Sequence, residues 1–275
     1  MTRIALFQSR TGIIPQANVR ALVAAIGQAA DGGAEILFTP EMSGLLDRDT
    51  QRARLNLRSE DEDAVLAASR EAAKGHGIWV YLGSLAVLLD DGKVANRAFL
   101  IDREGKIRAR YDKIHLFDVD LPTGESWRES STYSAGRDVA VVNGTPVGKL
   151  GLTICYDLRF PTLFARLAEA GADVIAVPAA FTVPTGRAHW HVLLRARAIE
   201  AGLFVVAAAQ VGRHEDGRQT FGHSLVVDPW GEVLLDMGDE EGVGFADIDL
   251  ARISDVRSRI PALNHRRPIP EAVTV

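Results

Sequence analysis

The stretch Leu150-Gly-Leu-Thr-Ile-Cys155 is followed directly by Tyr156-Asp-Leu-Arg-Phe-Pro161, which joins a short apolar run to the proline that opens a helical pattern. Such a run is typical of a buried strand, and proline is favoured at the first position of a helix. The sequence therefore predicts a strand, a turn and a helix, with Cys155 at the carboxyl end of the strand. Open α/β sheets place their binding sites at this edge.

Strand and helix patterns alternate along the rest of the chain. Turn sequences such as Asp90-Asp-Gly-Lys93 and Arg103-Glu-Gly-Lys106, and a hairpin around Asp228-Pro-Trp-Gly231, predict mixed rather than purely parallel sheets. Residues 112–137 show little periodicity and are interpreted as a long functional loop. The pattern predicts one α/β domain over residues 1–275, with two sheets covered by helices. Strands are expected at residues 4–7, 35–38, 78–82, 138–142, 149–155, 173–178, 203–209 and 244–249, and helices at 15–31, 59–75, 161–170, 186–200 and 250–260.

The composition is that of an ordinary globular protein, and it excludes several classes. The 275 residues carry 36 Asp+Glu against 31 Lys+Arg, a net charge of −5, which argues against binding to nucleic acid. A single cysteine excludes an intrachain disulfide and any zinc site with two or more thiolates. No apolar run has the length of a signal-peptide core or a membrane helix. We therefore expect a cytoplasmic protein with no membrane or nucleic-acid partner.

The single cysteine, Cys155, is either a small buried hydrophobe or a nucleophile, and a nucleophile needs a base. His115, in the predicted loop, is one candidate base. His189 and His191 lie two positions apart in a helical pattern, so they face different directions and should not share a metal ion. Most of the histidines are interpreted as structural.

Glu41 and Lys113 fit Cys155 better than any histidine does. Glu41 follows the strand expected at residues 35–38, and Lys113 ends a strand-like run that starts at residue 108. An isolated Glu or Lys is usually a solvated surface residue. Three reactive side chains at the ends of three separate strands, however, form the pattern of a site on a rigid scaffold.

Three sequence blocks around these residues resemble the signature blocks of the nitrilase superfamily of carbon–nitrogen hydrolases. The resemblance implies a four-layer α-β-β-α sandwich with two mixed sheets, and an enzyme acting on linear amides rather than peptide bonds. It also implies a catalytic triad of Glu41, Lys113 and Cys155. Glu129 matches the second glutamate of the family, whereas Glu125 fits the spacing from Lys113 less well. The blocks are Phe38-Thr-Pro-Glu-Met42, Tyr111-Asp-Lys-Ile-His-Leu-Phe117 and Gly151-Leu-Thr-Ile-Cys-Tyr-Asp-Leu-Arg-Phe-Pro161, and the resemblance continues through residues 189–200 and 222–231.

The resemblance further implies a thioester on Cys155, with Glu41 moving protons. The oxyanion would be bound by Lys113 and the Tyr156 backbone N–H. The ordinary pKa values of Glu and Cys, ~4.3 and ~8.5, differ by about four units. We expect burial to raise the pKa of Glu41. We also expect the Lys113 charge to lower the pKa of Cys155, so that the pKa values of Glu41 and Cys155 converge. Glu41 and Glu129 should keep Lys113 protonated, and no cofactor or metal is expected.

Segments 115–119 and 228–231 resemble the Nit branch of the superfamily. This branch implies an amide of a small 2-oxo acid, of the deaminated glutathione type, with Arg213 as a candidate to bind a substrate carboxylate. Alternatives are omega-amidase chemistry on 2-oxoglutaramate or 2-oxosuccinamate, another amidase or carbamoylase, and a catalytically silent binding or scaffold protein. His191 and Ala201 stand where the family usually has Glu and Asn or Thr, which bears on substrate range. The family also implies a homodimer or a larger homo-oligomer.

Overall fold

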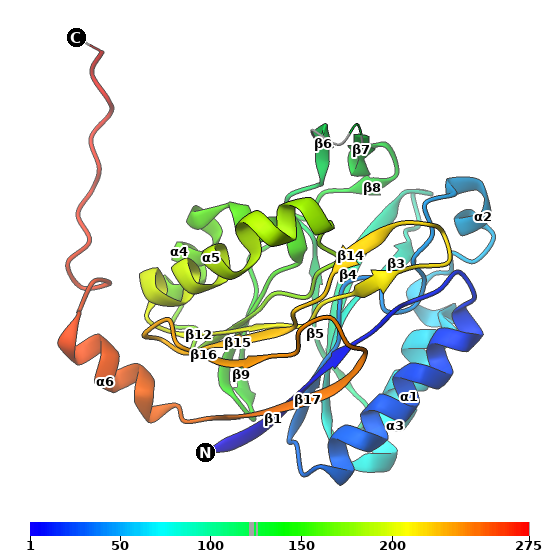
Figure 1. The fold of residues 1–275 in the computed structure, drawn as a ribbon, viewed down its shortest axis with the longest axis horizontal. Helices are drawn as coiled ribbons and strands as arrows, with labels where there is room; N and C mark the ends of the chain where they lie inside the picture. The colour runs from blue at the N-terminus through cyan, green and yellow to red at the C-terminus, as the bar shows by residue number, and fades with distance from the viewer. Residues whose placement is uncertain (121–123, 125, 275) are drawn as a thin grey trace.

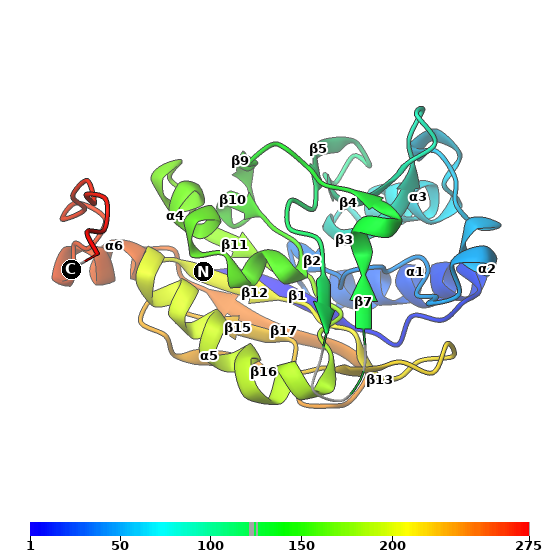
Figure 2. The same cartoon turned by 90° about the horizontal axis from the view of Figure 1, so that it is seen from above.

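Two β-sheets stack face to face in the computed structural model, which describes residues 1–120, 124 and 126–274, and helices lie outside each sheet (Figures 1 and 2). Both sheets contain parallel and antiparallel strand pairs. The prediction of a four-layer α-β-β-α sandwich with two mixed sheets is therefore confirmed. None of the described helices is long and apolar enough to cross a membrane.

The first sheet is built around β1 (Thr2–Gln8), which pairs in parallel with β2 (Ile36–Phe38) and antiparallel with β17 (Gly242–Ile248). Helices α1 (Pro15–Asp31) and α3 (Ala64–His76) cover its outer face (Figure 1). The order is β17-β1-β2-β3-β4-β5, with β8 beside β4. The remaining strands of this sheet are β3 (Trp79–Leu88), β4 (Val94–Ile101), β5 (Ile107–Asp112) and β8 (Tyr133–Ser134).

The second sheet has the order β16-β15-β12-β11-β10-β9, and helices α4 (Pro161–Glu169) and α5 (Val183–Ala201) cover its outer face (Figure 2). Both helices carry proline in their first turn, as the sequence led us to expect for α4. A last helix, α6 (Ala251–Arg259), follows β17. The strands of this sheet are β9 (Val141–Thr145), β10 (Gly148–Leu152), β11 (Val174–Ala176), β12 (Phe204–Ala207), β15 (Leu225–Val227) and β16 (Val233–Asp236).

The main core lies between the two sheets. Side chains alternate along a strand, so Ile4 and Leu6 of β1 face the second sheet, whereas Ala5 faces α1 and α3. The central strands are buried on both faces, which explains why they appear in the sequence as continuous apolar runs. Stacking the sheets in this way brings the ends of β2, β5 and β10 into one region, and the site lies there.

The structure differs from the sequence prediction in the polar connections. Residues 112–137, interpreted as a loop, contain β6 (Asp118–Asp120), β7 (Ser126–Arg128) and a 3-10 turn at Glu129–Ser131, as well as β8. A hairpin of β13 (Val211–Arg213) and β14 (Gln219–Phe221) and the short helix α2 (Thr50–Arg54) were not predicted. These elements bury few apolar side chains, so they leave no hydrophobic period in the sequence.

Candidate active site

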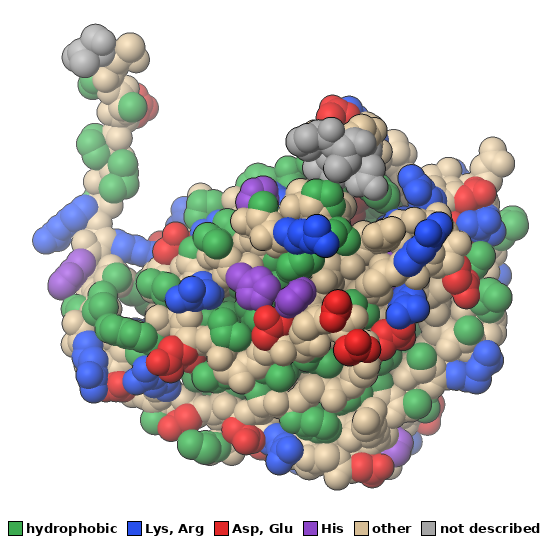
Figure 3. All heavy atoms as spheres, in the orientation of Figure 1, with side chains coloured by type: hydrophobic (Ala, Val, Ile, Leu, Met, Phe, Trp, Pro, Cys, Tyr) green, Lys and Arg blue, Asp and Glu red, His purple; other side chains and the backbone are tan. Residues whose placement is uncertain are grey.

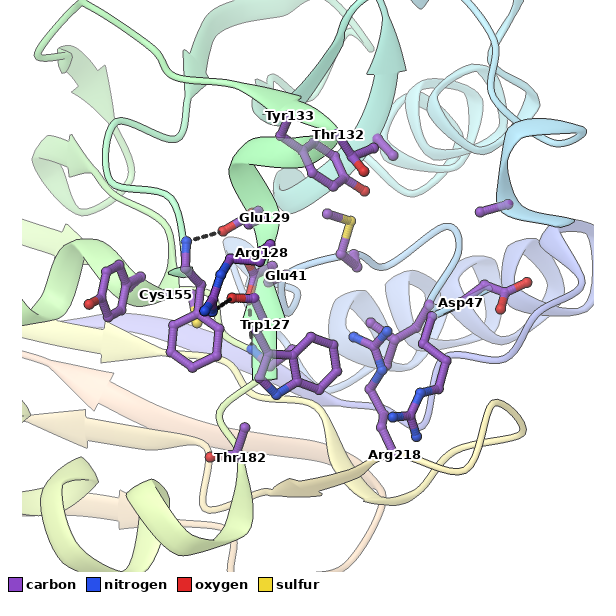
Figure 4. A pocket seen from close by; sticks show the side chains of 18 of the residues that line it. Glu41, Asp47, Trp127, Arg128, Glu129, Thr132, Tyr133, Cys155, Thr182 and Arg218 are labelled. Carbon is purple, nitrogen blue, oxygen red and sulfur yellow. Dashed lines mark hydrogen bonds between the residues drawn. The ribbon is translucent and has the colours of Figure 1, made fainter. Parts of the chain in front are cut away.

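Glu41, Lys113 and Cys155 meet at one end of a cavity of about 450 Å³. Glu41 comes from the segment after β2, Lys113 directly follows β5, and Cys155 follows β10. All three are buried, with exposed fractions of 5%, 2% and 7%. Figure 4 shows Glu41, Glu129 and Cys155 grouped together, with Asp47 and Arg218 farther along the cavity.

The Lys113 ammonium group is held between two carboxylates. Its Nζ donates to Glu41 Oε1 at 2.9 Å and to Glu129 Oε2 at 2.8 Å. Asn96 of β4, which the sequence analysis did not single out, donates to Glu41 Oε1 at 2.9 Å and to Glu129 Oε1 at 3.1 Å. Glu129 thus forms an ion pair with Lys113 as a second glutamate, and Glu125 lies outside the described residues.

The backbone at Cys155 adopts a positive φ of 48°, which is uncommon for a residue other than glycine. The Cys155 N–H donates to Pro178 O at 2.8 Å, and the buried Asp157 carboxylate accepts from the Ile154 N–H at 2.9 Å. His115 contacts the same carboxylate through Nδ1 at 2.7 Å. His115 therefore supports the turn and is not among the described residues that line the cavity.

The neighbouring charges determine the protonation of the site. Burial opposes the charge of Glu41, but the Lys113 ammonium and hydrogen bonds from Lys113, Cys155 and Asn96 hold its pKa below the ordinary value. Burial also opposes the charge of Lys113, yet the Glu129 and Glu41 carboxylates raise its pKa well above the ordinary value. Burial and the Glu41 charge raise the pKa of the Cys155 thiol well above its ordinary value, which Lys113 only partly offsets.

The pKa values of Glu41 and Cys155 therefore move apart, and the prediction that they converge is wrong for this resting site. The physical reason is that Lys113 forms ion pairs with two carboxylates, so its charge stabilises Glu41 more than it stabilises a thiolate. The resting site holds an ionised Glu41, a protonated Lys113 and a neutral thiol.

The other two residues predicted for the site lie in different places. Tyr156 lines the cavity directly beside Cys155. Arg213 is exposed on β13 and is not among the described lining residues, whereas Arg218, across the same hairpin, is one of them. The Asp216-Gly217 turn between the two strands is a hairpin signal that could have identified this arrangement.

The outer end of the cavity carries cationic and aromatic side chains that the sequence analysis missed. The guanidinium carbons of Arg218 and Arg48 lie 4.9 Å and 5.9 Å from the Trp127 ring centroid. Arg218 Nε also donates to Asp216 Oδ2 at 2.8 Å. Within the described part of the chain, the buried Trp127 indole N–H has no hydrogen-bond acceptor. Asp47 also lines this end, so its charges are mixed, and the guanidinium groups of Arg48 and Arg218 are the groups there that suit a negatively charged ligand group.

Comparison with known proteins identifies the class. The family model for carbon-nitrogen hydrolases matches residues 3–258. The chain therefore belongs to the carbon-nitrogen hydrolase family, within the nitrilase superfamily, and is a hydrolase with an active-site cysteine.

The relatives include amidases. The chain is 38% identical to deaminated glutathione amidase from Yersinia enterocolitica, over 98% of this chain and 94% of the relative. The NitFhit protein of C. elegans superposes with a TM-score of 0.89 at 37% identity, over 97% of this chain but only 65% of that longer one. An amidase from Nesterenkonia sp. AN1, solved after Michael addition of acrylamide at its active-site cysteine, has a TM-score of 0.79 at 28% identity, over 95% of this chain and 98% of that one.

Proposed function

We propose that this enzyme hydrolyses a linear amide through a thioester on Cys155. The observation that carries the proposal is the buried Lys113 ammonium, held at 2.9 Å and 2.8 Å by Glu41 and Glu129 beside the single cysteine. A thiol, a carboxylate base and a fixed cation in one cavity are the groups that acyl transfer requires.

Glu41 is ionised and Cys155 is neutral at rest, so the thiol proton passes to Glu41 as the sulfur attacks the carbonyl carbon. Glu41 then gives that proton to the amine nitrogen, and the C–N bond breaks. In the second half, a water molecule gives a proton to Glu41 and attacks the thioester, and the C–S bond breaks. The proton returns to the sulfur, which restores the thiol.

The Lys113 ammonium and the Tyr156 N–H are the proposed donors to the oxyanion. Tyr156 lies in the first turn of the 3-10 helix Cys155–Arg159, where N–H groups have no acceptor within the helix. Glu129 acts on Lys113 rather than on substrate, because it also accepts from the Phe117 N–H at 2.6 Å and so fixes the direction of the ammonium. Removing one such donor typically lowers kcat by about 10²–10³-fold.

The proposed substrate is a 2-oxo acid amide of the deaminated glutathione type, which carries a carboxylate on the amine side as well as on the acyl side. Arg218 and Arg48 support this choice, since their guanidinium groups are cationic hydrogen-bond donors at the outer end of the cavity. Omega-amidase substrates are smaller and have no amine-side carboxylate for these groups. Relatives that are deaminated glutathione amidases support the same choice.

Parallel assays with deaminated glutathione and 2-oxoglutaramate test the proposal, with the released amine and ammonia measured separately. We expect kcat/KM to be higher for deaminated glutathione, with no turnover in a folded Cys155→Ala variant. Preference for 2-oxoglutaramate would favour the omega-amidase alternative. Turnover of neither substrate would point to another amidase or carbamoylase, and full activity of Cys155→Ala would refute the thioester.

We also propose a homodimer, or a larger homo-oligomer, in a cytoplasmic setting that keeps the cysteine reduced. Val192 and Ile199, both on α5, are 67% and 51% exposed, and Trp230 is 47% exposed. Ile199 and Trp230 line one surface pocket, and contiguous exposed apolar patches mark surfaces that bind another protein. Light scattering after size-exclusion chromatography gives the mass in solution, and a monomeric mass would contradict the dimer.

A further inference from the structure

A second cluster of reactive side chains lies outside the cavity. His191 belongs to α5, His223 precedes β15, and Asp236 ends β16. One ligand atom from each residue lies within 4.8 Å of the other two. Figure 3 shows histidine side chains gathered with acidic ones on one face of the molecule. We propose that His191, His223 and Asp236 form a binding site for a divalent first-row transition-metal ion such as Zn²⁺.

The donor set fits such an ion. Asp236 Oδ2 lies 2.9 Å from His191 Nε2, and Asp236 Oδ1 lies 2.9 Å from His223 Nδ1. Two imidazoles and one carboxylate suit zinc and its neighbours in the first row, and they leave a fourth position for water. Ligand atoms 2.0–2.2 Å from one ion are at most about 4.4 Å apart. Small side-chain rotations therefore suffice to bind an ion.

Surrounding contacts fix His223 in place. Its φ of 55° is uncommon for a residue other than glycine, and two hydrogen bonds of its backbone hold it: its N–H donates to Gly238 O at 2.6 Å, and its carbonyl accepts from Trp190 Nε1 at 2.8 Å. The His223 ring stacks on Phe221 with centroids 4.4 Å apart. The Gly238 N–H also donates to Asp236 Oδ1 at 3.0 Å. Contacts of this kind orient the ligands of metal sites.

The cluster is accessible from solvent, and it connects two layers of the fold. The side chains of His191, His223 and Asp236 are 36%, 28% and 34% exposed. An ion bound here would link helix α5 to the β15–β16 hairpin of the sheet beneath it. An ion that binds the folded chain but not the unfolded chain stabilises the protein against unfolding. His189, two residues before His191, contacts Arg159 instead, at 3.2 Å, and offers a matched control.

Calorimetric titration with Zn²⁺ tests the proposal, using tag-free protein that carries Cys155→Ser so that no thiol competes. We expect saturation at one ion per chain and a higher unfolding temperature with Zn²⁺. His191→Gln, Asp236→Asn and His223→Asn should each weaken binding by more than about 10-fold, whereas His189→Gln should not. Asn tolerates the backbone conformation of His223, and His191→Gln can keep the hydrogen bond to Asp236, so folding should persist.

Unfolding curves recorded without metal verify that each variant is folded. Should His223→Asn fail to fold, the comparison rests on the other two ligand variants. The absence of saturable Zn²⁺ binding by the parent protein would overturn the proposal. Equal binding by the parent, His191→Gln and Asp236→Asn would also overturn it, because the ion would then lie elsewhere.

Discussion

The two ends of the cavity differ in how their charged side chains are buried and paired. At the inner end, the buried Glu41 and Lys113 form an ion pair, which holds Glu41 ionised and Lys113 protonated before any ligand enters, and Glu129 forms a second ion pair with Lys113. At the outer end, Arg48 and Arg218 lie over Trp127, whose indole N–H finds no acceptor in the described part of the chain. Under the proposed function, the inner end performs the chemistry and the outer end selects the substrate.

The largest effect is expected from Lys113→Met, which removes the cation at the inner end of the cavity. The variant loses a proposed oxyanion donor, so kcat should fall by at least about 10²–10³-fold. It also leaves the buried Glu41 carboxylate and the half-buried Glu129 carboxylate without their cation, and breaking a buried ion pair typically costs about 3–5 kcal/mol of stability. Lys113→Arg should not restore kcat, because a planar guanidinium places its donors differently.

Single-turnover kinetics and urea unfolding measure these two losses separately. Lys93→Met, on the exposed turn between β3 and β4, is the matched control and should change neither quantity. A Lys113→Met variant with kcat near that of the parent would remove Lys113 from the mechanism.

A smaller effect, confined to substrate binding, is expected at the outer end. Arg218→Ala should raise KM for a substrate with an amine-side carboxylate by about 10–100-fold, since a charge-assisted hydrogen bond contributes about 1.5–3 kcal/mol. Its kcat should change little. Arg213→Ala, on the exposed strand of the same hairpin, is the control. If Arg213→Ala raised KM and Arg218→Ala did not, the assignment of the two arginines would be reversed.

The smallest effect concerns pH, where we expect little change across a wide range. The pKa of Glu41 lies below its ordinary value, and that of Cys155 lies above its ordinary value. Glu41 therefore stays ionised and the thiol neutral between these limits, so kcat/KM of the free enzyme should be flat there. The stability contributed by Glu41 is lost as pH falls through its lowered pKa, and the stability contributed by Lys113 is lost as pH rises through its raised pKa.

A pH profile of kcat/KM at constant ionic strength checks this expectation. A limb between pH 6 and 8 whose slope corresponds to about one proton would show that Glu41 and Cys155 titrate in the neutral range instead. Any residual activity of Lys113→Met should show its acid limb at higher pH, because burial then raises the pKa of Glu41 without the opposing charge of Lys113.

The sequence predicted the elements that carry the core. Residues 4–7, 15–31 and 161–170 correspond to β1, α1 and α4. Apolar periodicity and proline position are local properties that act in the same way wherever the element packs. The polar connections were predicted poorly, because β6 and β7 bury no whole residue and the short β13–β14 hairpin buries only Val211 and Thr220, which is too little for a hydrophobic period.

By itself, the sequence determined that Cys155 lies at a strand end, and it placed Glu41 and Lys113 at two others. Only the tertiary structure decided that Arg218 rather than Arg213 lines the cavity, and that His191 joins His223 and Asp236. It also reversed the expected directions of the Glu41 and Cys155 pKa shifts. A pKa depends on burial and on every charge within a few ångströms, and those neighbours come from distant parts of the chain.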